Sequence, residues 1–202
     1  MNKLAIYGAS GHGKVVADIS RRNGYSDILF IDDGDNEFIN FDNFCKEFTD
    51  ILHIALGIGD NYTRSKVFEK VQKAGYKIIT LIDSSAIISP SAKIEIGTVI
   101  MPNVVINADT YISYGTILNS GAVVEHDIKV GKFSHISPNV GLAGGVVVGN
   151  FTHIGIGTSV IQNINIGNDV VVGAGSVVIK DIKDNVVVVG NPASIIKEKN
   201  GK

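Results

Sequence analysis

The chain has 202 residues, a formal net charge of −2 at pH 7 and one cysteine, Cys45. The near-neutral charge gives no reason to expect nucleic acid as a partner. A single cysteine excludes an intrachain disulfide and fits a reducing compartment. We expect no signal peptide, because the first apolar run is short and glycines follow it, and no apolar segment approaches membrane-spanning length. We therefore expect a cytoplasmic protein of one or two small domains.

The first predicted elements are a buried strand at 3–7, a glycine-rich turn and a helix at 14–23. In this order, backbone N–H groups and a helix N-terminus can bind an anion, usually a phosphate. The turn runs from Gly8 to Gly13 with the spacing G-x-x-G-x-G, which differs from the dinucleotide spacing G-x-G-x-x-G. The motif alone therefore leaves open a glycine-rich turn that binds no ligand.

Two acidic residues follow the second predicted strand, at 28–31. Asp32 and Asp33 lie about twenty residues after the glycine turn, where an acid can accept hydrogen bonds from a ribose or sugar hydroxyl. The alternative is an aspartate that only caps the strand. Residues 34–49, which come next, are expected to be irregular.

A third strand at 51–56, a helix at 62–74 and a fourth strand at 78–82 complete a truncated, Rossmann-like α/β domain. We expect this domain to span residues 1–83. Gly57 follows the third strand and is expected at the mouth of the same crevice as the first turn. A domain of this size suits one nucleotide or nucleotide sugar better than a dinucleotide.

Every sixth residue from position 88 to position 178 is Ile, Leu or Val, without a break. A period of six fits neither an α-helix nor a flat strand, and it indicates a parallel β-helix in which three hexads form one triangular coil. The sixteen aliphatic residues are predicted to point inward and to make about five coils. We expect this domain at 84–181, followed by a closing segment and a polar, frayed tail at 182–202.

A second column supports the β-helix. The residue four places after each aliphatic is small or β-branched, as expected near a corner where a bulky side chain would clash. Glycines in the repeat are expected to supply turns with positive φ; the examples are Gly131, Gly149, Gly167 and Gly173.

The strongest candidate for chemistry is His126, which lies between Glu125 and Asp127. A carboxylate that holds one imidazole nitrogen fixes the tautomer and raises the basicity of the other nitrogen, as a general base requires. The alternative is a solvated corner with no catalytic role. We expect no metal site, because His126 and His135 lack a third ligand at usable spacing.

Gly144 and Gly145 interrupt the usual hexad chemistry. Exposed backbone N–H groups there could stabilise an oxyanion, although a corner that relieves crowding explains the pair equally well. The flat faces of a β-helix suit packing against copies of the same chain. We therefore expect a threefold assembly, with polar groups available for a site between subunits.

Taken together, these motifs resemble a known family. The hexad column and the ending Val-Gly-Asn-Pro-Ala at 189–193 resemble the left-handed β-helix acyltransferases. The N-terminal Tyr-Gly-Ala-Ser-Gly-His-Gly, the Asp32-Asp33 pair, the Ala-Leu-Gly-Ile-Gly-Asp-Asn turn and the Glu-His-Asp triplet resemble the bacterial sugar acetyltransferases of the sialic-acid O-acetyltransferase group. Within that group, the chain is most similar to the UDP-4-amino-sugar N-acetyltransferases that make UDP-N,N′-diacetylbacillosamine for protein glycosylation.

The resemblance implies a homotrimer that uses acetyl-CoA, with no metal, to acetylate the 4-amino group of UDP-2-acetamido-4-amino-2,4,6-trideoxyglucose. It implies His126 as general base, supported by Asp127 or Glu125. It also implies that Ser10, Gly11 and His12 contact the phosphates of the nucleotide sugar, that Asp32 and Asp33 bind uridine or ribose, and that Gly57 lines that pocket. Asn119 and His135 are implied to contact the substrate or the acetyl group. Gly144 is implied to bind the thioester carbonyl, and Ile156 and Ala174 to line the CoA channel.

Three other functions stay open. The chain could be an O-acetyltransferase of sialic acid, or an N-acetyltransferase of another nucleotide-linked amino sugar. In a different class, it could be a non-catalytic trimeric protein that binds a nucleotide sugar. The Glu-His-Asp triplet and the Gly-Asn-Pro-Ala ending favour an enzyme over the last of these.

Overall fold

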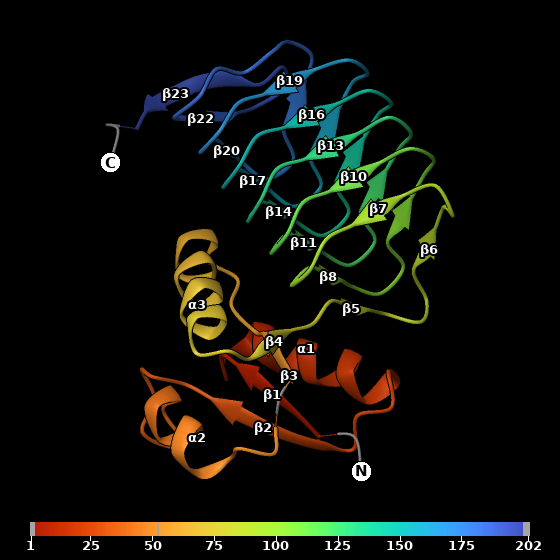
Figure 1. Ribbon diagram of the computed structural model, residues 1–202. Helices are drawn as coiled ribbons and strands as arrows, with labels where there is room; N and C mark the ends of the chain where they lie inside the picture. Colours follow the sequence, from red (N-terminus) through yellow and green to blue (C-terminus); the bar gives the residue numbers. More distant parts are fainter. Residues whose placement is uncertain (1–2, 52, 200–202) are drawn as a thin grey trace.

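The structure, a computed structural model, describes residues 3–51 and 53–199. An α/β unit formed by the N-terminal part of the chain lies against one end of a β-helix, and the C-terminal strands lie at the opposite end (Figure 1). None of the helices in the described part of the chain is long and apolar enough to cross a membrane.

The N-terminal unit contains one parallel sheet in the order β2-β1-β3-β4. Its strands are β1 (Lys3–Tyr7), β2 (Asp27–Ile31), β3 (His53–Leu56) and β4 (Lys77–Ile78). Its helices are α1 (Gly11–Arg22), α2 (Phe41–Glu47) and α3 (Asn61–Lys73). The first three predicted strands and both predicted helices are confirmed, although α1 begins three residues before its predicted start.

Helix α2 corrects the expectation that residues 34–49 are irregular. The Asn40 side chain caps the helix by accepting a hydrogen bond from the Asn43 N–H at 2.9 Å. Phe41 and Phe44 are buried and stack against each other, and both pack on Tyr76. The helix therefore depends on a cap and on aromatic contacts with a distant part of the chain, and neither has a periodic signal in this segment.

The fourth predicted strand, at 78–82, is two strands that belong to different sheets. β4 pairs with β3, whereas β5 (Leu81–Ile82) pairs with β8 (Val99–Ile100) of the β-helix. The chain therefore enters the β-helix just after Ile78. The predicted domain boundary at residue 83 stays a prediction.

Two-residue strands make up the coils of the β-helix, in about six turns where the sequence predicted about five. Beyond β5 and β8 they are β6 (Ile87–Ile88), β7 (Lys93–Ile94), β9 (Val105–Ile106), β10 (Tyr111–Ile112), β11 (Ile117–Leu118), β12 (Val123–Val124), β13 (Lys129–Val130), β14 (His135–Ile136), β15 (Gly141–Leu142), β16 (Val147–Val148), β17 (His153–Ile154), β18 (Ser159–Val160), β19 (Asn165–Ile166), β20 (Val171–Val172) and β21 (Val177–Val178).

These strands form the three parallel sheets of a triangular prism. We call them the first face (β5-β8-β11-β14-β17-β20, continued by β22 and β23), the second face (β6-β9-β12-β15-β18-β21) and the third face (β7-β10-β13-β16-β19). From β5 to β21, strands that pair with each other lie eighteen residues apart, for example Val124 with Leu142 and Ile136 with Ile154. The predicted stacking of hexads is confirmed.

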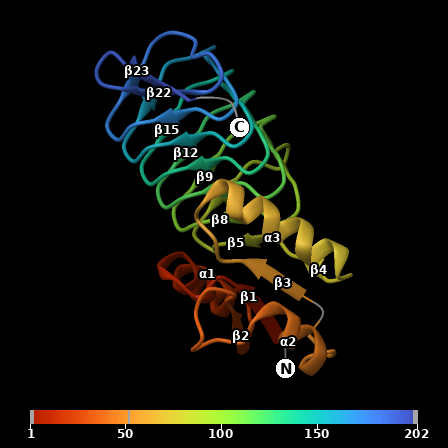
Figure 2. The same ribbon diagram turned by 90° about the vertical axis from the view of Figure 1, so that its left-hand side faces the viewer.

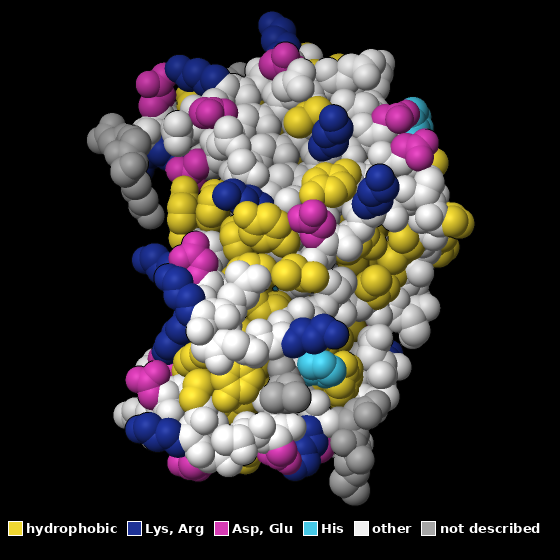
Figure 3. Space-filling model, viewed as in Figure 1, with side chains coloured by type: hydrophobic (Ala, Val, Ile, Leu, Met, Phe, Trp, Pro, Cys, Tyr) yellow, Lys and Arg dark blue, Asp and Glu magenta, His cyan; other side chains and the backbone are white. Residues whose placement is uncertain are grey.

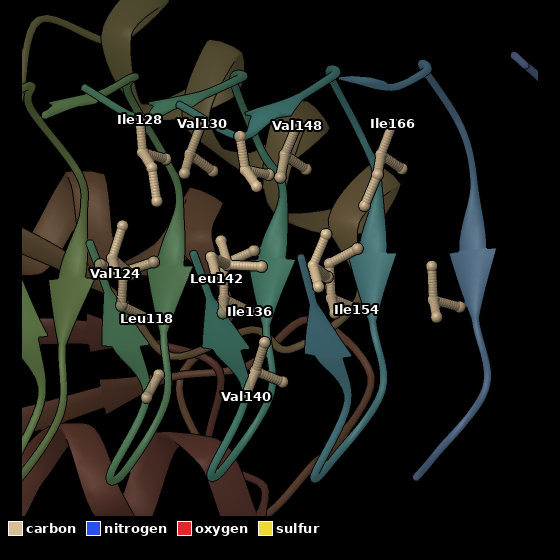
Figure 4. Close-up of a cluster of buried hydrophobic side chains, with 14 of the residues drawn as sticks. Leu118, Val124, Ile128, Val130, Ile136, Val140, Leu142, Val148, Ile154 and Ile166 are labelled. Atoms are coloured by element: carbon tan, nitrogen blue, oxygen red, sulfur yellow. The ribbon is translucent and has the colours of Figure 1, made fainter. Parts of the chain in front are cut away.

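The aliphatic column fills the interior of the coils, as Figure 4 shows for Leu118, Ile136 and Ile154. From Ile100 to Val178 its members are at most 4% exposed. From Thr98 onward the second column is buried as well, and its hydroxyl groups donate to carbonyls fifteen residues later, except at Ser176, which donates to the Gly173 carbonyl. Ser134 Oγ, for example, donates to the Gly149 carbonyl at 2.7 Å. Polar corner residues are therefore tolerated because each one donates to a backbone carbonyl, in most cases one in the next coil.

The four glycines predicted to need positive φ have other backbone angles. A Cβ on Gly131 would lie 2.6 Å from the Gly149 carbonyl carbon, and one on Gly149 would lie 2.5 Å from the carbonyl carbon of Gly167. Gly173 is similarly close to Val189. These glycines therefore permit close approach of successive coils. The left-handed corners are occupied by other glycines and by nine non-glycine residues, including Asp127 at φ 60°.

The C-terminal part contains β22 (Val186–Val189) and β23 (Ser194–Glu198). β22 continues the first face in parallel with β20, and β23 turns back antiparallel to β22. Lys199 Nζ then donates to Asp169 Oδ1 at 2.7 Å. The expectation of a frayed tail is therefore wrong as far as residue 199.

The N-terminal unit is fixed to the first face of the β-helix. Helix α1 packs beside Leu81, Val99 and Ile117 of that face in one apolar cluster. Helix α3 lies alongside the coils (Figures 1 and 2), and Phe68 packs edge-on against Phe133 at 5.3 Å between ring centroids. Side chains of the N-terminal unit therefore meet the outward side chains of the first face.

Candidate active site

A cavity of about 480 Å³ opens at the carboxyl ends of β1, β2 and β3, with Ser10, Asp32 and Asp33 in its wall. Gly59 and Asp60, on the turn after β3, also line it. This is the crevice in which parallel α/β sheets bind ligands. Gly57, directly after β3, is not among the described residues that line this cavity, and its N–H donates to the Tyr7 carbonyl at 2.8 Å.

Three glycines bring the backbones of this crevice into contact. A Cβ on Gly13, in the first turn of α1, would lie 1.9 Å from the Gly8 carbonyl oxygen. A Cβ on Gly8 would lie 2.6 Å from the Gly57 oxygen, and Gly8 itself has φ +112°. No other residue type fits this packing. The glycine spacing therefore sets the position of the N-terminus of α1 at the edge of the cavity.

The two predicted acids of the crevice both have protein partners. Asp32 Oδ2 accepts from the Ala9 N–H, and its Oδ1 accepts from the Gly34 N–H, each at 3.0 Å. Asp33 accepts from the Phe41 N–H, the Tyr7 hydroxyl and Lys70 Nζ at 2.6–2.8 Å. Burial opposes ionisation of Asp33, but these bonds outweigh burial and hold its pKa below the usual value. Both carboxylates therefore hold the walls of the cavity in place.

Three histidines meet where α1 lies against the first face. The rings of His12 and His135 are 6.3 Å apart, and His153 stacks on His135 at 4.8 Å. Asn119, a predicted site residue, lies 3.0 Å from His135 Nε2, and Ser137 Oγ lies 2.8 Å from His153 Nε2. His153 was missed in the sequence, although it follows His135 by eighteen residues and pairs with it across two coils.

These histidines are held neutral. Burial, followed by the charge of Arg64, lowers the pKa of His12 to about 4. Burial and the neighbouring His153 lower the pKa of His135 to about 3. Asn119 Oδ1 accepts from the Ser120 N–H, so the NH₂ group of Asn119 faces His135 Nε2.

His126 lies on the corner between the second and third faces and is 62% exposed. Its Nδ1 is 2.8 Å from Asp127 Oδ2, which leaves Nε2 directed away from that carboxylate. Glu125 is engaged elsewhere, because its Oε2 accepts from Asn107 Nδ2 at 2.9 Å. Of the two acids beside His126, Asp127 is therefore the one that contacts the imidazole.

Gly144 lies under His126 in the next coil. A Cβ at this position would be 2.6 Å from His126 Cε1 and 2.7 Å from Nε2, so the ring covers the glycine backbone. Among the described residues, the Gly144 N–H donates to no protein acceptor. The same is true of Ala108 and Gln162 at equivalent corners, but only at Gly144 does an imidazole lie alongside.

Replacing Gly144 by alanine is expected to displace the His126 ring and to lower kcat at least about tenfold, without loss of the fold. The ring is exposed and can swing aside, so the added methyl group moves the imidazole rather than the coil. Steady-state kinetics beside circular dichroism checks this expectation. Wild-type kcat in a folded Gly144→Ala variant would contradict it.

The predicted site residues lie at three places in one chain. Ser10, His12 and His135 lie with the N-terminal unit on the first face, whereas His126 and Gly144 lie on the corner opposite that face. Ile156 and Ala174 lie one coil apart on the corner between the first and second faces, and Ile156 is 51% exposed. A single chain therefore does not bring His126 to the crevice of the N-terminal unit.

Two further cavities flank α3. One, of about 440 Å³, is lined by His135 and His153 together with Tyr62 and Lys199. The other, of about 630 Å³, is lined by aromatic residues such as Phe68 where α3 meets the coils. Hydrophobic side chains gather in the middle part of the surface shown in Figure 3. The larger cavity contains none of the predicted site residues. Among the described residues, no three His, Cys, Asp or Glu side chains are arranged to hold a metal ion.

Comparison with known proteins identifies relatives of the chain. Residues 3–71 match the family model of the PglD N-terminal domain. GDP-perosamine N-acetyltransferase from Caulobacter crescentus, solved as a histidine mutant with CoA and GDP-perosamine, is 34% identical, with a TM-score of 0.93 and 98% of each chain covered. The acetyltransferase domain of PglB from Neisseria gonorrhoeae, solved with acetyl coenzyme A, is 36% identical, with a TM-score of 0.90, 97% of this chain covered and 100% of that one.

A curated relative extends the comparison. The UDP-N-acetylbacillosamine N-acetyltransferase of Bacillus subtilis is 39% identical over 113 residues, which are 49% of this chain and 51% of that protein. The chain thus aligns with about half the length of this relative.

A prism of hexapeptide coils joined to a small α/β unit, together with these relatives, defines an acetyltransferase of the β-helix class. Within that class, the chain belongs to the family of sugar N-acetyltransferases that carry a PglD-type N-terminal domain. The predicted fold and the predicted family are both confirmed.

Proposed function

We propose that the protein transfers the acetyl group of acetyl-CoA to the 4-amino group of a nucleotide-linked amino sugar, with UDP-2-acetamido-4-amino-2,4,6-trideoxyglucose as the predicted acceptor. The observation that carries the proposal is the end-to-end similarity to a relative solved with CoA and GDP-perosamine. The curated bacillosamine relative supports the UDP-linked acceptor.

The crevice of the N-terminal unit suits the nucleotide part of the acceptor. The N-terminus of α1, with Ser10 as its N-cap and Gly11 in its first turn, presents N–H groups to the diphosphate. His12 Nε2 is buried and has no hydrogen-bond partner among the described residues, so it is available to the same ligand. The nucleoside occupies the cavity between Asp32 and the turn after Gly57.

The chemical step is direct acetyl transfer. The 4-amino group attacks the thioester carbon, and His126 Nε2 takes the proton that the amine loses. Asp127 holds Nδ1 and stabilises the imidazolium that forms. The oxyanion of the tetrahedral intermediate accepts a hydrogen bond from the Gly144 N–H, and its collapse releases CoA as the thiol after proton return from His126. No covalent enzyme intermediate is required.

A homotrimer would complete this site. The outward residues of the second face carry no charge: Ile87, Val105, Val123, Gly141, Ser159 and Val177. Ile87 is 68% exposed and Val123 is 36% exposed, whereas the third face presents Lys93 and Lys129. Packing the second faces around a threefold axis would place the His126 corner of one subunit beside the first face of the next.

Mixed oligomers test the shared site. Subunits that carry His126→Ala and subunits that carry Asp32→Ala are each expected to be inactive alone. Co-expression should restore a measurable fraction of activity, because some interfaces then combine an intact His126 with an intact crevice. The control is an oligomer in which every subunit carries both wild-type residues. Mixed trimers without recovered activity would contradict a site between subunits.

Guanine is a second candidate for the nucleotide base, because the Caulobacter relative is named for GDP-perosamine. An assay of thiol release from acetyl-CoA with UDP-linked and GDP-linked 4-amino sugars and with free sialic acid separates the possibilities. We expect the highest kcat/KM with the UDP-linked amine. Faster release with the GDP-linked sugar would favour the second candidate. Release with sialic acid alone would contradict N-acetylation.

A further inference from the structure

Arg64 is a fully buried arginine in α3, with 0% exposure. Its five N–H groups contact six acceptors at 2.7–3.3 Å, with one N–H shared between two of them, and every acceptor is neutral: the carbonyls of Ile58, Gly59, Gly115, Phe133 and Ser134 and the side-chain oxygen of Asn61. Because its N–H donors lie in one rigid plane, a guanidinium bonded in this way constrains both the distance and the orientation of the groups that accept its hydrogen bonds.

The acceptors come from both parts of the molecule. Ile58 and Gly59 form the turn after β3, and Gly59 lines both the crevice of about 480 Å³ and the adjoining cavity of about 440 Å³. Gly115 and Ser134 belong to corners of the β-helix, and Ser134 directly precedes His135. Arg64 therefore joins the turn that borders the nucleotide crevice to the coil that carries the histidine cluster.

The charge of Arg64 also reaches the site. Burial lowers the pKa of Arg64 to about 9, and the charge of Asp60 in the crevice wall opposes this shift, so Arg64 stays cationic at neutral pH. After burial, its charge is a further cause of the lowered pKa of His12 and of His153. A buried cation beside a crevice attracts an anionic ligand, because the surrounding protein screens it less than water would.

We propose that Arg64 is a positioning residue of the nucleotide-sugar site: it holds the Ile58–Gly59 turn against the His135 coil and supplies a buried positive charge toward the diphosphate. The inference rests on the proposed function, since it takes a nucleotide diphosphate as the ligand of the crevice. Arg64 touches no reacting atom, and its effect is therefore expected on nucleotide binding and not on acetyl-CoA binding.

The test is Arg64→Lys, which keeps the charge and loses the planar donor set. Titration calorimetry with UDP and with GDP should show at least tenfold weaker binding than wild type, and KM for the nucleotide sugar should rise similarly. Binding of acetyl-CoA should stay within about twofold. Arg22→Lys is the matched control, because Arg22 also joins the N-terminal unit to the coils, through Asp83, without touching the turn.

A second variant covers the case in which Arg64→Lys does not fold. Asn61→Ala removes one acceptor of Arg64 and leaves the arginine in place, and it should weaken UDP or GDP binding in the same direction by a smaller factor. Wild-type nucleotide affinity in both folded variants would overturn the inference. Equal loss of nucleotide and acetyl-CoA binding would also overturn it. If wild-type protein bound neither nucleotide, the proposed function would fail first, and the inference with it.

Discussion

His126→Ala is expected to lower kcat roughly a hundredfold to ten-thousandfold, the usual contribution of a general base. The imidazole is 62% exposed, and its one hydrogen bond among the described residues goes to Asp127, so its removal should leave the fold and oligomeric state unchanged. Thiol release at saturating acetyl-CoA and acceptor measures the loss. Near-wild-type turnover in the alanine variant would remove His126 from the mechanism.

The neighbouring acids provide an internal comparison. Asp127→Asn keeps the size of the side chain but removes the charge that stabilises the imidazolium, so kcat should fall by about tenfold or more. Glu125→Gln should have a smaller effect, because Glu125 bonds to Asn107 and not to His126. The reverse order of the two effects would show that Glu125 is the supporting acid when substrate is bound.

Gly13→Ala is expected to cost about 3 kcal/mol or more of folding free energy, and with it nucleotide binding. The added Cβ would lie 1.9 Å from the Gly8 carbonyl oxygen and 2.9 Å from its carbon, so α1 must shift away from the sheet. Because overlap with backbone cannot be relieved by a rotamer change, the cost is larger than for most added methyl groups.

Urea denaturation followed by far-UV circular dichroism measures this loss, and Gly11→Ala is its matched control. Gly11 lies in the same turn of α1, but nothing lies within 4 Å of its added Cβ. Alanine there should leave stability unchanged or raise it by about 0.5–1 kcal/mol through lower flexibility of the unfolded chain. A Gly13→Ala variant as stable as the Gly11→Ala variant would show that the crevice relaxes more easily than its packing indicates.

The β-helix could be predicted from the sequence because each coil repeats one packing requirement at a fixed spacing. An inward aliphatic every six residues has no other explanation, and Val124, Leu142 and Val160 stack as that spacing requires. The strands around the crevice could be predicted for a similar reason, since buried parallel strands are short apolar runs that end in glycine or aspartate.

Other features depend on contacts that no local pattern records. Helix α2 is stabilised by Tyr76, more than thirty positions away. β4 and β5 look like one strand, because their division depends on which sheet each one joins. The importance of Arg64 follows from six acceptors scattered over the chain, and a lone arginine in a helix gives no sign of them.

The two halves of the candidate site illustrate the same limit. The sequence singles out both His126 and His12 by chemistry, but the fold places them on opposite sides of a prism. They would meet only in the proposed homotrimer, and the feature that supports this proposal is the uncharged second face, whose residues are distributed over six strands.

The antiparallel return of β23 has a consequence for growth of the stack. A parallel coil exposes a pairing edge that another coil, or another molecule, could extend without limit. On the first face, the last strand, β23, runs in the opposite direction and carries Lys197 and Glu198. Its direction and its charged side chains therefore disfavour pairing with a further parallel coil. The N-terminal unit covers the other end of the same face. Both ends of the first face are therefore closed to further strand pairing, so the hexapeptide repeat forms a β-helix of fixed length and not a fibre.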